Sequence, residues 1–405
     1  MTPTAAKHNS PDRFFLFALF ALTVLGVVMV YSSTAVMPVA KSGGSMVNEG
    51  RGYQFMYLKK HLVTLLIALM GMFSFYRMSL KKLNRLSYLF LAAAFVLLVA
   101  VFIPGLGVKI NGAKRWLRLW PSTFQPSEFV KFAMILYLAS YLSDRKYDLR
   151  RFKDFMKPIG VMLLFQAVML MQPDFGGAFT LGVITITLIY LAGAPIKYLL
   201  ALAGATAPVL VYLLTTPYRL KRIFAFLDPW QDPYGDGFQL VQSFVALGSG
   251  GLKGVGLGEG MQKLNFLPEV NTDFIFSLIG EELGLLGALF TISMFLLLFI
   301  RGMKIAERTK GRFSYYLCTG LVLMIVYQMI INVAVVTGLL PTKGLPLPFI
   351  SYGGSSLLIN FISAGVILRI SRSEDEPLEM LTKEQIIKRR VRLRRKQFNL
   401  RRTLR

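Results

Sequence analysis

Long apolar stretches dominate this sequence of 405 residues and restrict the folds that are open to it. Ten of them approach the length that a helix needs to cross a lipid bilayer, about 20 residues. The bilayer interior offers no partners to backbone hydrogen-bonding groups, and long stretches without polar alternation suit helices rather than barrel strands. We therefore predict an all-α polytopic membrane protein with about ten transmembrane helices, centred in 14–31, 61–75, 88–104, 126–142, 159–171, 178–192, 198–215, 274–300, 315–339 and 356–370.

The distribution of basic residues predicts the orientation of these spans. The net charge is +25, which alone would be compatible with nucleic-acid binding. When the spans alternate, however, 31 of the 46 Lys and Arg residues fall on one side and 14 on the other, with Lys131 inside a span. This bias places both termini in the cytoplasm. In the tail, 10 of the 18 residues from 388 to 405 are basic, which favours contact with anionic lipid headgroups and not with nucleic acid.

The predicted organisation is a short cytoplasmic N-terminus (1–13), a ten-helix membrane domain (14–370) and a basic cytoplasmic tail (371–405). The first stretch follows Lys7 and Arg13 as in a signal peptide, but it lacks a convincing cleavage site and is expected to remain as a span. Cys318 is the single cysteine, so an intramolecular disulfide is excluded and zinc-type ligand spacing is absent. The halves show no clear repeat, which weakens the case for a secondary transporter.

Three polar segments rich in turn residues fall on the predicted outer side: 105–125, 216–273 and 341–355. The second is too long for a simple connection, and loops of that length are usually functional or disordered. Its last residue, Asp273, lies where the loop enters an apolar helix, at a predicted membrane boundary. A carboxylate there could simply cap the helix. Because ionisable groups at membrane depth are costly, it is also a candidate for function.

Other acids occur close to Asp273 in the sequence. Glu269 lies four residues earlier, and Glu281 and Glu282 lie about two turns deeper in the same predicted helix. Carboxylates with apolar or like-charged neighbours have raised pKa values, which brings them toward the range useful for proton abstraction. This cluster makes Asp273 the candidate catalytic residue and Glu269 a candidate substrate-binding residue.

Charged residues also occur near the other outer segments. Glu128 and Lys131 are three residues apart in the fourth predicted span, so they can neutralise each other, either as a structural ion pair or to position a substrate. Arg115 and Arg219 lie outside, against the overall charge bias, and a guanidinium suits a phosphate group. They predict an anionic headgroup on the outer side.

Glycine makes up seven of the thirteen residues from 248 to 260, yet neither a P-loop nor a dinucleotide fingerprint is present. These glycines fit a backbone that turns tightly or approaches a ligand closely. Ser351 and Ser355 lie in the turn-rich segment 346–356 on the predicted outer side. They are candidate substrate-binding residues, because polar groups of this segment could line the cavity that holds the substrate.

Five motifs together resemble the SEDS family, which comprises FtsW, RodA and SpoVE. They are 112–116, 125–131, 172–176, 256–276 and 346–356, and they span nearly the whole membrane region. The resemblance implies a peptidoglycan glycosyltransferase that polymerises lipid II outside the cytoplasmic (inner) membrane with a class B penicillin-binding protein of the FtsI type. The segments 172–177 and 227–230 look closer to the division branch, so we expect a septal location and other division proteins as partners.

The resemblance also implies site residues. Asp273 matches the essential outer-loop aspartate of the family, although the histidine usual two residues earlier is Asn271 here. Glu128 and Lys131 match the family's paired charges, and Arg115 matches an arginine of an outer loop. As a mechanism we expect Asp273 to take the proton of an acceptor sugar hydroxyl. Arg115, Arg219, Lys131 and a divalent cation, Mg or Mn, would stabilise the leaving pyrophosphate, although the sequence shows no dedicated metal site.

Two alternatives remain open from the sequence. A lipid II flippase would also use intramembrane charges, but it needs them along the whole path, whereas most of the notable charges lie on the outer half. A non-catalytic scaffold for division proteins would need none of these charges.

Overall fold

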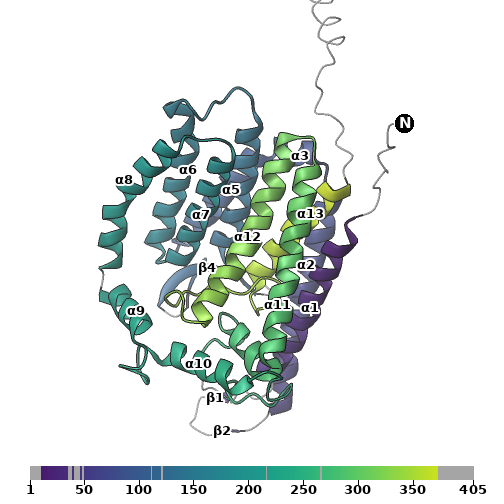
Figure 1. Ribbon diagram of the computed structural model, residues 1–405, viewed down its shortest axis with the longest axis vertical. Coiled ribbons are helices and arrows are strands. Elements are labelled where there is room, and N and C mark those ends of the chain that lie inside the picture. Colours follow the sequence, from purple (N-terminus) through teal and green to yellow (C-terminus); the bar gives the residue numbers. More distant parts are fainter. Residues whose placement is uncertain are drawn as a thin grey trace, which may run out of the picture.

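The computed structural model describes residues 11–34, 39–40, 46–47, 50–110, 112–119, 122–215, 217–264 and 267–372, and the chain is mostly helical (Figure 1). The basic tail and the first ten residues, on which predictions were made, lie outside the described residues. Helices coincide with all ten predicted apolar stretches: α1 (Arg13–Thr34), α2 (Gly50–Arg77), α4 (Ser87–Ala100), α5 (Pro126–Ser143), α6 (Phe152–Met171), α7 (Phe175–Leu191), α8 (Ile196–Leu214), α11 (Ile275–Arg308), α12 (Arg312–Val336) and α13 (Gly354–Arg372).

The helix surfaces indicate a multi-pass membrane protein. Within the described residues, six helices are long and apolar enough to cross a membrane, and the apolar helices α4 and α7 are shorter. Large apolar side chains point outward from the bundle: Phe20 is 68% exposed, Val96 64% and Leu200 68%. Apolar surface of this extent is rare on soluble monomers and suits contact with lipid tails.

Helices α5 and α12 form the centre of the bundle and pack against each other. Helix α5 begins with Pro126, which fits the first turn of a helix because that position needs no backbone N–H donor. Polar side chains of α12 and α13 face the bundle interior: Gln328 is 0%, Asn332 2% and Asn360 1% exposed.

Smaller elements gather at one end of the bundle, which we call the loop end. The segment after α4 forms an antiparallel sheet in the order β3 (Gly107–Ile110), β4 (Ala113–Leu119), β5 (Ser122–Phe124). The long loop contains α9 (Pro217–Leu227) and α10 (Phe238–Gly250), and the short strands β1 (Val39–Ala40) and β2 (Met46–Val47) lie at the same end (Figure 1). Helix α3 (Leu80–Arg85) lies at the opposite end.

Helix α11 is interrupted, which the sequence analysis did not predict. Gly284 has φ +66° and ψ −164°, values outside the helical region. The glycine-rich segment after α10 enters the break: Val255 N donates to the Glu281 carbonyl at 3.0 Å, and Leu285 N donates to the Gly251 carbonyl at 2.9 Å. The hydrogen bonds lost at the break are thus replaced, as they must be in an apolar environment. The glycines therefore allow backbone to approach backbone.

Candidate active site

Asp273 lies at the loop end, directly before α11. Its backbone is fixed on both sides, because Asp273 N donates to the Glu269 carbonyl at 3.1 Å and Asn332 Nδ2 donates to the Asp273 carbonyl at 2.7 Å. The N-cap of α11 is Phe274, and no side chain caps the helix. Among the described residues the Asp273 carboxylate has no hydrogen-bonding partner. The simple capping role is therefore not the one that this side chain has.

The environment of this carboxyl group favours its neutral form. Burial raises the pKa of Asp273 to about 7, and the negative charge of Glu269 contributes in the same direction, whereas Arg115 and Arg222 oppose the rise. Gly344 packs against the carboxylate, since a Cβ atom there would lie 3.0 Å from Asp273 Oδ2. A carboxyl group with a pKa near neutrality is suited to accepting a proton at physiological pH.

Glu269 shapes the turn that holds Asp273. It has φ +57°, a left-handed conformation that costs free energy for a residue with a Cβ atom. Its carbonyl accepts from the backbone N–H groups of Thr272, Asp273 and Phe274 at 3.0, 3.1 and 3.3 Å. Its exposed carboxylate accepts from Thr272 Oγ1 at 3.0 Å. Glu269 thus acts on Asp273 through both backbone geometry and charge.

Two cations, Arg115 and Arg222, act on this carboxyl group, and a third, Lys343, lies in the segment that packs against it. Arg115 on β4 lies 4.0 Å from Asp174 Oδ1, measured from its Nη1 atom. Arg222 on α9 donates from Nη1 to the Thr342 carbonyl at 3.3 Å. Lys343, next in sequence to Gly344, lies over the Phe179 ring with Nζ 3.8 Å from the centroid, and burial lowers the pKa of its ammonium group. These groups give the site positive charge beside a weakly acidic carboxyl.

Neither Lys343 nor Arg222 was predicted as a site residue from the sequence. Lys343 lies three residues before the motif at 346–356, on the predicted outer side. A single lysine at that position was the sequence feature that could have identified it as a site residue. For Arg219, the structure describes the backbone as part of α9 but not the side chain.

The two candidate serines connect segments of the site. Ser351 Oγ donates to the Thr272 carbonyl at 2.6 Å and accepts from Leu347 N at 2.7 Å. Ser355 Oγ accepts from Gln125 N at 2.8 Å. The segments 269–274, 341–355 and 122–127 are therefore connected by these hydrogen bonds. Both hydroxyls already have protein partners, and a role of either serine in substrate binding stays a prediction.

Glu128 and Lys131 form the predicted pair. Lys131 Nζ lies 2.7 Å from Glu128 Oε1, and Gln328 Nε2 donates to Glu128 Oε2 at 3.2 Å. Both side chains are enclosed, with Lys131 0% and Glu128 3% exposed. This arrangement neutralises both charges inside the bundle, as expected for a buried ion pair. Whether the pair also positions a substrate stays a prediction.

The structure assigns Glu281 and Glu282 a different environment from that of Asp273. Glu281 Oε1 accepts from Met261 N at 2.7 Å, and Glu282 Oε1 lies 2.9 Å from Lys263 Nζ. Ser32 on α1 donates to Glu282 Oε1 at 2.7 Å. These two acids hold the glycine-rich segment against α11 and α1. Their contacts are with the glycine-rich segment and α1, so they form a cluster separate from Asp273.

Comparison with known proteins agrees with this architecture. The family model described as "Cell cycle protein", which covers FtsW, RodA and SpoVE, matches residues 12–376. A "Probable peptidoglycan glycosyltransferase FtsW" from Geobacter sp. (strain M18) is 42% identical over 362 residues, which cover 89% of this chain and 96% of the relative. The "Stage V sporulation protein E" of Bacillus subtilis (strain 168) is 38% identical over 372 residues, 90% of this chain and 98% of the relative.

Solved structures show the same fold. A chain in the structure described as "Structural coordination of polymerization and crosslinking by a peptidoglycan synthase complex" has a TM-score of 0.72 and 28% identity, and the match covers 90% of this chain and 99% of that one. The rod shape determining protein RodA of Thermus thermophilus has a TM-score of 0.65 and 26% identity, over 89% of this chain and 97% of that one. These matches show that the chain belongs to the FtsW, RodA and SpoVE family of cell cycle proteins.

Proposed function

We propose that this protein is a peptidoglycan glycosyltransferase that polymerises lipid II, with Asp273 as the general base. The observation that carries the proposal is a carboxyl group with a pKa of about 7, without a hydrogen-bonding partner among the described residues, beside the two cations Arg115 and Arg222. The names of the relatives and the shared fold support the same reaction class.

The proposed step is a single displacement. The acceptor sugar hydroxyl oxygen forms a bond to the anomeric carbon of the donor while the bond from that carbon to the lipid pyrophosphate breaks. Asp273 takes the hydroxyl proton, and the anomeric carbon is inverted. The leaving pyrophosphate gains negative charge, which fixed cations stabilise. Arg115, Arg222 and Lys343 are the proposed contacts, and the predicted Arg219 stays a candidate. Lys131 is enclosed in its ion pair and is proposed only as a residue that supports the site.

The membrane arrangement of this proposal follows the charge bias. We propose that all ten long helices cross the cytoplasmic membrane, that both termini are cytoplasmic and that the loop end faces outward. Lipid tails would then lie along the helices while headgroups meet near Asp273. The likeness to FtsW relatives supports a role at the division septum with a class B penicillin-binding protein and other division proteins.

We propose a divalent cation, Mg or Mn, only in combination with substrate. The described residues contain no group of three or more His, Cys, Asp or Glu side chains that could hold a metal ion. Mg²⁺ in such sites is commonly held by one or two carboxylates together with substrate phosphates. Glu269 and the donor pyrophosphate fit that chemistry, and Asp273 would remain the group that takes the proton.

The test is polymerisation of lipid II by purified Asp273→Asn protein, alone and with a class B penicillin-binding protein. We expect loss of polymerisation with an unchanged melting temperature, because Asn has the same size but cannot act as a base. Asp236→Asn is the matched control, since Asp236 lies in the same outer loop but is 53% exposed and only weakly paired, 4.0 Å from Lys221.

The assay also separates the alternatives. Lipid II in detergent needs no translocation, so a flippase or a scaffold would show no polymerisation even in the unmodified protein. Substantial activity of Asp273→Asn would reject the assignment of the base while leaving the reaction class in place.

A further inference from the structure

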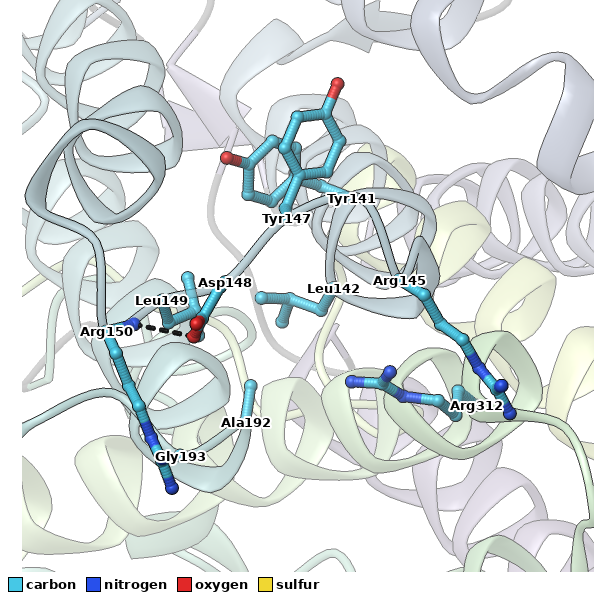
Figure 2. Close-up of a pocket in the computed structure, with 10 residues that line it drawn as sticks. All are labelled: Tyr141, Leu142, Arg145, Tyr147, Asp148, Leu149, Arg150, Ala192, Gly193 and Arg312. Atoms are coloured by element: carbon cyan, nitrogen blue, oxygen red, sulfur yellow. Dashed lines mark hydrogen bonds between the residues drawn. The ribbon is translucent and has the colours of Figure 1, made fainter.

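We infer that a cavity at the end of the bundle opposite Asp273 binds the phosphate headgroup of an acidic membrane lipid. The cavity has a volume of about 450 Å³ and is lined by residues of three separate segments. Arg145 and Arg150 come from the turn between α5 and α6, Gly193 from the turn between α7 and α8, and Arg312 is the first residue of α12. Figure 2 shows Arg145 and Arg312 on one side of the cavity and Arg150 on the other, near Gly193.

The charges on the cavity wall are not balanced by the protein. Three guanidinium groups line it together with one carboxylate, that of Asp148. Asp148 Oδ1 accepts from the backbone N–H of Arg150 at 3.0 Å, as Figure 2 shows, so it is occupied by the turn and not by a guanidinium group. Within the described part of the chain, no ion pair or side-chain hydrogen bond involves the guanidinium groups of Arg145, Arg150 and Arg312. The site therefore favours an anion.

Neighbouring acids do not supply that anion. Asp154, at the start of α6, pairs with Lys157 at 2.9 Å. Asp144 Oδ1 accepts from Lys146 N at 2.9 Å. The arginines are also exposed, so their repulsion is relieved only by solvent and salt until a ligand binds.

The shape and position of the cavity favour a lipid phosphate. Guanidinium groups bind phosphate oxygens in a bidentate manner. Buried Leu142 and Leu149 form an apolar part of the wall, and Tyr141 stacks on Tyr147 with ring centroids 4.1 Å apart. The cavity lies at helix ends, the level at which lipid headgroups meet a membrane protein. Basic pockets between transmembrane helices on the cytoplasmic side bind acidic headgroups. A phosphate with attached glycerol and acyl chains fits this combination.

The test uses full-length protein in nanodiscs of phosphatidylethanolamine with and without cardiolipin or phosphatidylglycerol, and native mass spectrometry counts the acidic lipids that remain bound. The variant is Arg145→Gln with Arg312→Gln. The control, Arg85→Gln with Arg308→Gln, removes two exposed arginines that do not line the cavity. Each lost charge-assisted hydrogen bond to the phosphate should weaken binding by about tenfold, so the cavity variant should bind acidic lipid about a hundredfold more weakly, whereas the control loses no such contact.

The expected result is loss of retained acidic lipid in the cavity variant and not in the control, with the same melting temperature for both in neutral lipid. Equal loss in both would show a general surface effect and overturn the site. In a separate arm, inorganic phosphate is titrated into protein in neutral detergent. Binding of free phosphate as tightly as of acidic lipid would overturn the lipid assignment in favour of a soluble phosphate ligand. Because neither variant touches Asp273, these outcomes are independent of the polymerisation test.

Discussion

The acid–base property of Asp273 can be shifted in opposite directions by two neighbouring charges. Burial is the largest cause of its raised pKa and Glu269 the second, while Arg115 and Arg222 oppose it. A rise from 3.8 to about 7 disfavours the ionised carboxylate by about 4 kcal/mol, at about 1.36 kcal/mol per pKa unit. Glu269 is exposed, so solvent screens its charge and its share is less than half of this free energy.

We therefore expect Glu269→Gln to lower the pKa of Asp273 by about one unit. The base would then stay ionised to lower pH. At pH 6 about one-tenth of a group with a pKa of 7 is ionised, against about half of a group with a pKa of 6. Relative to its own plateau, kcat/KM for polymerisation at pH 6 should rise about fivefold. Arg222→Gln removes a positive charge that lowers the pKa of Asp273. In this variant the acidic limb of the pH profile of kcat/KM should therefore move to higher pH.

The measurement is the pH dependence of kcat/KM between pH 5 and 8 for the two variants, with Glu259→Gln as control. Glu259 is an exposed acid in the glycine-rich segment, and its charge does not contribute to the pKa of Asp273. The reasoning is refuted if the Glu269 and Arg222 variants shift the limb in the same direction, or if neither shifts it. Either result would mean that another group governs the rate.

Three further predictions concern groups that support the site. Lys131→Met leaves the buried Glu128 carboxylate unpaired and should reduce the free energy of unfolding by about 3 to 5 kcal/mol, whereas the double variant with Glu128→Gln should recover most of the loss in a denaturation assay. Gly284→Ala places a Cβ against backbone of the glycine-rich segment at a positive φ and should lower the melting temperature, whereas Gly204→Ala, with open space around it, should not. Asn332→Ala removes donors to two carbonyls and should reduce polymerisation more than lipid II binding, compared in a steady-state assay.

The helical part of the fold was predictable because long apolar stretches leave few alternatives in a membrane. The structure has a helix at each of the ten stretches, and most boundaries differ by a few residues, although α2 begins at Gly50 and not at 61, and α11 ends at Arg308 and not at 300. Helix α12, for example, ends at Val336 and not at 339, since Gly338 adopts φ +70°. Polar segments gave no such signal, and β3–β5, α9 and α10 were not predicted.

The break in α11 could not be predicted for a similar reason. Gly284 lies in an apolar stretch in which glycine is tolerated, and only the segment at 250–256, some thirty residues earlier, makes the break favourable by supplying hydrogen bonds. The environment of Glu282 could not be predicted either, because it also depends on a contact with a distant segment. Its carboxylate is near Asp273 in sequence, but its partner Lys263 is known only once the loop has folded back. Long-range contacts of this kind decide which acids are neutralised.

The pattern of neutralisation is the strongest structural reason to assign chemistry to Asp273. Glu128 is satisfied by Lys131, and Glu282 by a lysine and a serine. A buried carboxylate without such partners is costly and shifts its pKa until it is largely neutral. At Asp273 the protein fixes the main chain through Asn332 and leaves the carboxylate itself without a hydrogen bond to any described residue. If position 273 contributed only to the stability of the fold, an aspartate that caps α11 or an uncharged residue would be more favourable there. A position that is held rigidly by its backbone while its acid remains available is what proton abstraction requires.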